Sequence, residues 1–195
     1  SYAMSLERGA ANAFRVLLLC IFMAMTGLGV ISPIIPNYAS DLGATGFMIG
    51  LIYSSWSISR AALQTPIGRL ADRASKKKII VAGLASYTVA SILYAYATSA
   101  EMLVVIRLLH GVASAMVIPV AMAYVAELTP KGREGRYMGY MSTAMFGGFG
   151  AGPLLGGFLY EHHSSAAAFH AMSALVGFSL ILPLILVPEE KSFRK

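Results

Sequence analysis

The stretch Gly68-Arg-Leu-Ala-Asp-Arg-Ala-Ser-Lys-Lys-Lys-Ile-Ile80 decides how the chain folds, because it places a cluster of cations between two long apolar segments. So polar a segment cannot lie in hydrocarbon. Lys and Arg accumulate in short cytoplasmic loops of membrane proteins, so the stretch also predicts a side of the membrane. The composition agrees, because 57% of the 195 residues are hydrophobic and only 12% are charged, against roughly 25% charged in soluble domains.

Six apolar segments lie around this loop, each close to the roughly 20 residues that a helix needs to span a bilayer. They lie near 14–36, 45–67, 79–97, 102–126, 136–159 and 166–187. The sequence therefore predicts an all-α membrane protein with a six-helix transmembrane bundle at 14–187. We expect a cytoplasmic N-terminus at 1–13 and a cytoplasmic tail, or the start of a central linker, at 188–195. We interpret residues 1–3 as a remnant that precedes a natural start at Met4.

The net charge of +6 would also suit a nucleic-acid-binding protein, so the positions of the cations decide between the two interpretations. Lys and Arg lie before the first segment and after the second, fourth and sixth, whereas the loops on the opposite side contain none. This is the positive-inside pattern. We therefore expect an integral protein of the inner or plasma membrane, with both termini cytoplasmic, lipid as a partner and no nucleic acid. No nucleotide-binding loop, catalytic triad or metal-ligand cluster is present, so we expect no cofactor, no metal and no enzymatic activity.

Three motifs carry a resemblance to the major facilitator superfamily. The loop fits the family pattern at Gly68, Leu70, Ala71, Asp72, Arg73, Lys77 and Lys78, and departs from it at Ala74, Ser75 and Lys76. The run Arg107-Leu-Leu-His110-Gly111 is similar to the family's Arg-x-x-Gln-Gly, with His110 in place of Gln. The third motif matches the spacing of a signature associated with proton-coupled antiporters, at Gly139, Gly148, Gly152, Pro153, Gly156 and Gly157. The sequence thus resembles the amino-terminal six-helix half of a drug/proton antiporter.

Two of these motifs, the basic loop and the glycine run, also have a simpler interpretation. A basic hairpin between two membrane helices is common for topological reasons alone. Glycines every four residues form a smooth groove for close helix packing in many membrane proteins.

The resemblance implies a fold of two inverted three-helix repeats, and a second six-helix bundle that completes a site between the halves. That bundle would be the rest of a longer chain or a second copy. The implied function is proton-coupled efflux of a small amphipathic compound by alternating access. Gly68, Asp72 and Arg73 would form a cytoplasmic gate, and the glycine face would pack against the other bundle. The alternatives are a uniporter or symporter of a metabolite, and a six-helix membrane subunit that transports nothing.

Polar residues at helical spacing predict where the pathway of substrate or protons lies. Counting inward from Glu101 at about 1.5 Å per residue, Arg107 lies roughly 9 Å deep, and such a charge needs water or a partner. We expect Arg107, Gly111 and Ser114 to line the pathway, with His110 beside them. Other candidates come from the first two segments, at Asn37, Tyr38, Asp41, Arg60 and Gln64.

The partner of Arg107, the role of Arg60 and the source of a proton carrier each have alternatives. Asp41 is the acid that we expect nearest to Arg107, with Asn37, Tyr38 or water as alternatives. Arg60 could equally extend its side chain to the membrane surface. Because no acidic residue lies in the middle of a segment, a proton carrier would come from the second bundle, from His110 or from an acid at the edge.

Overall fold

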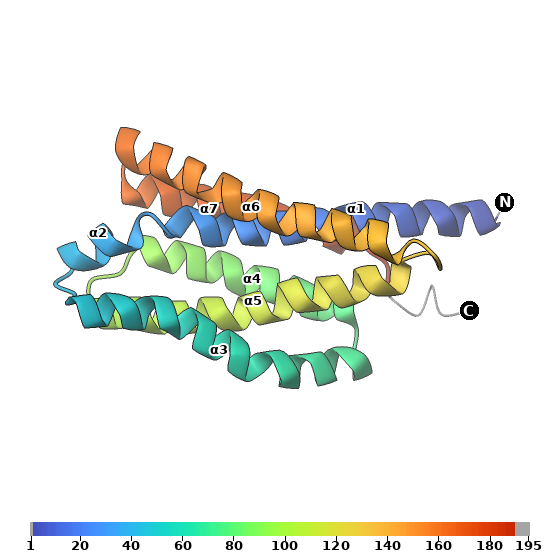
Figure 1. Cartoon of the computed structure of the whole chain (residues 1–195), viewed down its shortest axis with the longest axis horizontal. Coiled ribbons are helices and arrows are strands. Elements are labelled where there is room, and N and C mark those ends of the chain that lie inside the picture. The colour runs from blue at the N-terminus through green and yellow to red at the C-terminus, as the bar shows by residue number, and fades with distance from the viewer. Residues whose placement is uncertain (1, 190–195) are drawn as a thin grey trace.

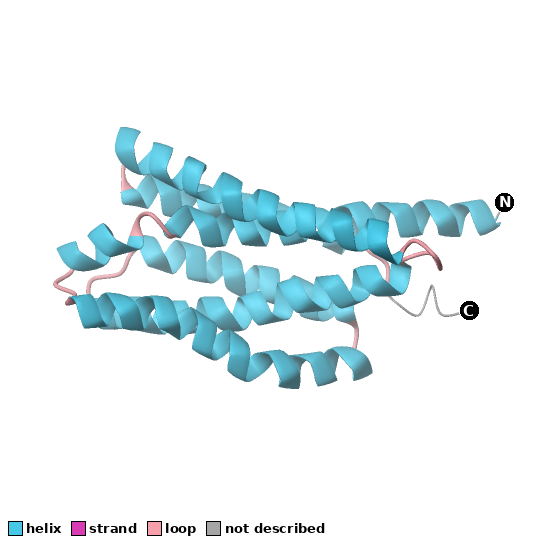
Figure 2. Cartoon of the chain, viewed as in Figure 1, coloured by secondary structure: helices cyan, strands magenta, loops and turns pink. Residues whose placement is uncertain are grey.

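A computed structural model of the chain describes residues 2–189, which form seven α-helices and no strand (Figure 2). Six helices have 20 to 30 residues, and α2 has seven. In chain order they are α1 (Tyr2–Ile31), α2 (Ile35–Asp41), α3 (Gly46–Arg73), α4 (Lys76–Ala95), α5 (Ala100–Leu128), α6 (Glu134–His162) and α7 (Ser165–Leu186). Of the predicted tail at 188–195, residues 190–195 lie outside the described part of the chain.

Four of the six long helices begin directly after a capping residue. The side-chain oxygens of Thr45, Ser75, Ser99 and Ser164 each accept a hydrogen bond from the backbone N–H three residues on. Such caps satisfy one of the free N–H groups in the first helical turn. The helices also run past the apolar segments into polar flanks, and α1 begins at Tyr2 rather than near residue 14.

The predicted single helix at 14–36 is interrupted, because α1 ends at Ile31 and the short α2 begins at Ile35. Pro33 and Pro36 have no N–H to donate to the preceding turn, so a continuous helix would lose two hydrogen bonds there. Another helix satisfies a carbonyl group at the break, since the hydroxyl of Tyr53 donates to the oxygen of Ser32 at 2.6 Å. The two prolines therefore coincide with a full break between α1 and α2.

The six long helices are arranged as two inverted repeats. In Figure 1, α1 and α5 run in opposite directions, and the main contacts of α1 are with α5, α6 and α7, while those of α5 are with α1, α3 and α4. Helix α4 also packs on α7. Exchanging α1 with α5, α3 with α6 and α4 with α7 leaves this set of contacts unchanged. The predicted pair of three-helix repeats is therefore present.

The loops divide between two ends of the bundle (Figure 1). We call the end with the N-terminus and the loops at 74–75 and 129–133 the basic end. We call the end with the turns at 32–34, 42–45, 96–99 and 163–164 the acidic end. Among the described residues, the exposed Asp41 and Glu161 lie at the acidic end and carry no cationic neighbour from the loops there.

Four of the described helices are long and apolar enough to cross a membrane, within Glu7–Ile31, Lys76–Ala95, Ala100–Leu128 and Ser165–Leu186. Helices α3 and α6 are as long but less apolar, because α3 carries Arg60 and Gln64 and α6 is rich in glycine. These two helices are also related by the exchange of the two repeats, and most of their residues are exposed. The protein is thus an integral membrane bundle in which α3 and α6 have distinct, open surfaces.

Candidate functional site

Arg107 is the buried charge at the centre of the candidate site. Its side chain is only 3% exposed, although it lies seven residues inside α5. Nε donates to the carbonyl oxygen of Ile52 at 3.1 Å, and Nη2 donates to that of Tyr53 at 3.3 Å. The guanidinium carbon also lies 5.8 Å from the centre of the Tyr53 ring. The guanidinium therefore binds neutral groups of α3.

The expected acidic partner of Arg107 is not present among the described residues. Asp41 and Asn37 are both exposed on α2, and neither forms an ion pair or hydrogen bond with the guanidinium in the described part of the chain. The cause is the break after Ile31, which turns α2 into a separate short helix. Carbonyl dipoles and aromatic rings lower the cost of burying the charge but do not neutralise it.

Trp56 joins two cations and was missed by the sequence analysis. The guanidinium carbons of Arg60 and Arg107 lie 5.1 and 5.9 Å from the centre of its ring. Its indole Nε1 donates to the hydroxyl of Ser114 at 3.0 Å. The spacing of four residues between Trp56 and Arg60 on one helix was an available signal for this contact.

His110 lies in a fully buried aromatic cage beside this site. Its Nδ1 and the hydroxyl of Tyr94 are 2.9 Å apart, and the Tyr87 ring centre is 4.5 Å from that of the imidazole. Among the described residues, Nε2 has no hydrogen-bond partner. Tyr38 connects α2 to the cage, since its hydroxyl donates to the carbonyl oxygen of Tyr94 at 2.6 Å. His110 and Tyr38 are thus part of one polar network with α4.

Gly111 allows α3 and α5 to touch at this site. A Cβ atom there would overlap the Ser59 hydroxyl and the carbonyl oxygen of Trp56. The same Ser59 hydroxyl donates to the carbonyl oxygen of Leu108 at 2.8 Å. The absence of a side chain at Gly111 therefore brings Trp56 within reach of Arg107 and Ser114.

The structure joins most of the predicted pathway residues but leaves three of them apart. Arg107, Gly111 and Ser114 meet Arg60 around Trp56, and His110 and Tyr38 adjoin them through Tyr94. The side chains that remain exposed and outside this group are Asn37, Asp41 and Gln64.

The predicted gate residues lie where α3 leaves the bundle. From Ala61 onward most side chains of α3 are exposed, and Figure 1 shows its C-terminal part diverging from α5. A Cβ atom at Gly68 would meet nothing within 4 Å, and Asp72 and Arg73 are exposed. Within the described chain, this motif has a free surface.

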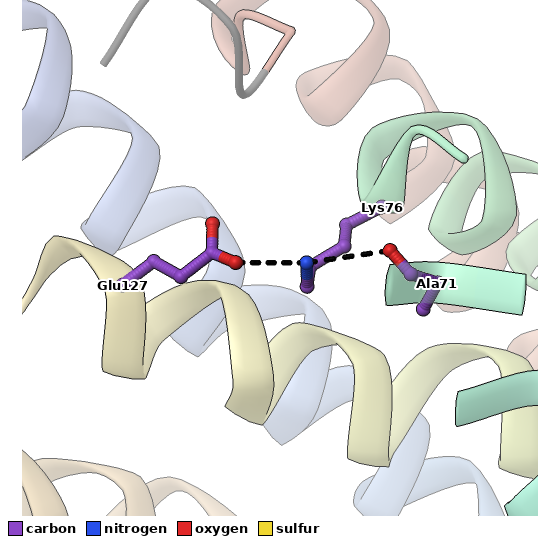
Figure 3. Close-up of polar contacts among 3 residues, drawn as sticks. All are labelled: Ala71, Lys76 and Glu127. Carbon is purple, nitrogen blue, oxygen red and sulfur yellow. Dashed lines mark hydrogen bonds and ion pairs between the residues drawn. The ribbon is translucent and has the colours of Figure 1, made fainter. Parts of the chain in front are cut away.

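Lys76, at the departure from the family pattern, forms an ion pair at the basic end. Its ammonium lies 2.8 Å from a carboxylate oxygen of Glu127 and donates to the carbonyl oxygen of Ala71 at 3.3 Å, as Figure 3 shows. Lys76 is 3% exposed and Glu127 is 38% exposed. The pair ties the start of α4 to the ends of α3 and α5. The sequence analysis missed Glu127, because nothing in the sequence pairs two residues 51 positions apart.

We expect Glu127→Gln to destabilise the bundle, because it leaves a buried ammonium beside a neutral amide. Removing one partner of a fully buried pair costs about 3–5 kcal/mol, and the partial exposure of Glu127 reduces this to about 1–3 kcal/mol. Thermal unfolding in detergent measures the loss. The double variant Lys76→Met/Glu127→Gln should recover part of it, because it removes both charges of the pair. Equal unfolding temperatures for Glu127→Gln and the unchanged protein would contradict this expectation.

The glycine motif of α6 packs against α1 of the same bundle. A Cβ atom at Gly148 would lie 2.5 Å from the carbonyl oxygen of Phe22, and one at Gly152 would lie 2.7 Å from Cα of Gly29. One at Gly156 would overlap the carbonyl group of Val30. The expectation that this face packs on a second bundle is therefore wrong for these three glycines, because their missing side chains are what allow α1 to approach.

The rest of the glycine motif lies around this contact. Pro153 contacts α1, since its Cδ lies 2.7 Å from where a Cβ atom of Gly29 would be. Cβ atoms at Gly139 and Gly157 would meet nothing within 4 Å in the described bundle. The motif thus has one face buried on α1 and another that is open.

Comparison with protein families decides where this bundle belongs. The model of the Major Facilitator Superfamily matches residues 17–195. The chain belongs to the Major Facilitator Superfamily. Its matched relatives in the superfamily are transporters rather than enzymes, as the sequence analysis predicted.

Two superfamily relatives illustrate the match. The chain is 38% identical over 175 residues to an uncharacterised transporter of Methanocaldococcus jannaschii, covering 90% of this chain and 44% of that protein. It is 32% identical over 176 residues to the quinolone resistance protein NorA of Staphylococcus aureus, covering 90% of this chain and 45% of NorA. The chain thus spans about half the length of the curated relatives that it matches.

A solved superfamily structure has the same fold. The crystal structure of the human organic anion transporter MFSD10 (TETRAN) superposes with a TM-score of 0.79, at 17% identity, over 92% of this chain and 48% of that one. At this identity the likeness supports the helical arrangement alone.

Proposed function

We propose that the chain is the amino-terminal half of a secondary active transporter that exports a small amphipathic compound in exchange for protons. The observation that carries the proposal is Arg107, a permanent cation that is 3% exposed and has only neutral partners in α3. A structural bundle gains nothing from such a charge, because burying it costs at least a few kcal/mol. A transporter can use it to hold a counter-charge that binds and leaves.

The efflux direction rests on the antiporter-type glycine motif and on the likeness to a quinolone resistance protein. The cation distribution supports an orientation with the basic end in the cytoplasm, and hence with both termini there. The membrane would be the inner or plasma membrane.

A second six-helix bundle is the partner that this half requires. Helix α3 exposes Ser54, Ser57 and Gln64, and α6 exposes large apolar side chains such as Phe146 and Leu154. Neither surface suits lipid alone, because α3 is too polar and α6 has an open glycine face. We propose that the second bundle covers both, as the remainder of a longer chain or as a second copy, and that the pathway lies between them.

Helices α3, α5 and α6 have no acidic side chain in their middle turns that could carry a proton. The acidic side chains of α3, α5 and α6 lie in their first or last turns, at Asp72, Glu101, Glu127, Glu134 and Glu161. The second bundle is our first candidate for the carrier, and His110 is the second.

Transport by the natural protein in vesicles tests this proposal. Export of an amphipathic dye should follow an imposed pH gradient and collapse when a proton ionophore removes the gradient. Flux that ignores the gradient would favour a uniporter, and flux with the proton gradient in the same direction would favour a symporter. No flux of any compound would favour the subunit that transports nothing.

We also propose that Asp72 holds the cytoplasmic gate closed by accepting hydrogen bonds from a helix N-terminus of the second bundle. The partial positive charge at a helix N-terminus stabilises a carboxylate by about 0.3–1 kcal/mol. Asp72→Asn should therefore shift the equilibrium between the closed and the inward-open gate several-fold towards the inward-open state. Labelling of cysteines placed in the pathway, from each membrane side, measures the shift. Arg136→Gln at the exposed start of α6 is the control. Unchanged labelling and transport in Asp72→Asn would leave the loop as a topology signal only.

A further inference from the structure

Two guanidinium groups share one indole ring in the described half, and no acidic side chain accompanies them. Arg107 is buried in α5, and Arg60 lies near the midpoint of α3. Both guanidinium carbons lie within 5.9 Å of the Trp56 ring centre. Like charges this close raise each other's electrostatic energy, the more so outside bulk water. The arrangement therefore has an uncompensated positive charge of two.

The two guanidinium groups differ in their contacts with the rest of the bundle. Arg107 donates through Nε and Nη2 to carbonyl groups of α3, which fixes its position. Arg60 is half-buried and stacks on Trp56. Ser57 and Gln64, one turn before and after Arg60, are exposed and polar. A ligand can therefore reach Arg60 from the exposed side of α3. Arg107, on α5, adds positive charge close to the same indole ring.

We propose that this site binds the carboxylate of an amphipathic organic anion, with Arg60 as the direct contact. A planar carboxylate matches the paired donors of a guanidinium, and such charge-assisted pairs are the stronger hydrogen bonds of proteins. The half-buried Tyr53 ring, two turns before Arg60 on the same helix, offers apolar surface for an aromatic or alkyl body beside the carboxylate. The charge of the anion offsets the repulsion between the two cations. The inference rests on the proposed transport function, because it names the substrate class of that pathway.

The test compares three ligands that share a naphthalene body and differ in charge, on the natural protein in nanodiscs. Calorimetry measures binding of 1-naphthoate, of the neutral 1-naphthamide and of a 1-naphthylmethylammonium salt. The carboxylate should bind at least about tenfold more tightly than the amide, because a hydrogen bond to a charged group contributes about 1.5–3 kcal/mol and 1.4 kcal/mol is tenfold. In Arg60→Gln this preference should disappear while the affinity for the amide stays the same. Arg60→Lys should keep part of it.

The exposed Arg69, on the same helix, provides the matched control, and Arg69→Gln should keep the full preference. Equal affinity for carboxylate and amide, a preference for the ammonium compound, no carboxylate binding, or a preference that survives in Arg60→Gln would each overturn the inference. The proposed function fails separately. If the protein exports a cationic dye in a proton-driven manner but shows no preference for the carboxylate, only the inference is contradicted. If it prefers the carboxylate but shows no proton-driven flux, only the proposed antiport is contradicted.

Discussion

Arg107→Ala is expected to reduce pH-driven transport by the natural protein severely while leaving insertion into the membrane intact. The variant removes a fixed charge that is 3% exposed, together with two hydrogen bonds to α3. A hydrogen bond to a charged group contributes about 1.5–3 kcal/mol, so the loss should reduce flux roughly ten- to a hundred-fold. Flux in inverted vesicles under an imposed pH gradient measures the effect.

The lysine variant separates charge from geometry at the same position. Arg107→Lys keeps the cation but loses the planar fork that reaches Ile52 and Tyr53 together, so part of the flux should return. Arg136→Ala, an exposed arginine at the start of α6, is the control and should transport normally. Full pH-driven transport by Arg107→Ala would assign Arg107 to bundle packing and remove it from the coupling site.

Gly152→Ala is expected to destabilise the contact between α6 and α1. The added methyl group would overlap the carbonyl oxygen of Thr26 and lie 2.7 Å from Cα of Gly29. Overpacking in a dense core costs about 1–3 kcal/mol, and here the obstacle is backbone, which cannot change rotamer. The unfolding temperature in detergent should therefore fall by several degrees.

Gly147→Ala on the same helix provides the matched control. Its methyl group would meet only ring atoms of Phe22, at 3.7 Å, which is an ordinary contact. Replacing a helical glycine by alanine gains roughly 0.5–1 kcal/mol elsewhere, so this variant should unfold at the same temperature or higher. If Gly152→Ala unfolds no earlier than Gly147→Ala, the close contact of α1 and α6 is not what the glycine spacing provides.

The positions of the six long helices could be predicted from the sequence, because hydropathy and charge report which solvent each segment meets. The predicted segment at 102–126 became Ala100–Leu128, and that at 166–187 became Ser165–Leu186. The break after Ile31 could not be placed, since proline shows where hydrogen bonds are lost but not whether a neighbouring helix replaces them. In this fold the hydroxyl of Tyr53 does so.

The residue types of the site could also be predicted, but their partners could not. Arg107, Gly111 and Ser114 were expected on one side of a helix with His110 beside them, and the structure brings them together around Trp56 and Tyr94. Trp56 was missed because an indole in an apolar segment is ordinary, and only tertiary contact places it between two guanidinium groups. The predicted packing partner of the glycine motif was wrong, because a run of small residues permits the close approach of another helix but does not indicate which helix that is.

The absence of side chains at Gly29, Gly152 and Gly156 puts main chain against main chain. Side chains can accommodate sliding by changing rotamers, whereas touching peptide planes have no such freedom. Helices α1 and α6 must therefore tilt together as one rigid body. Helix α3 is held to α5 by the same kind of close backbone contact at Gly111. In the proposed transport cycle, moving the access to Arg107 from one face of the membrane to the other would then require rocking of the entire half, with local bending left to the part of α3 beyond Ala61.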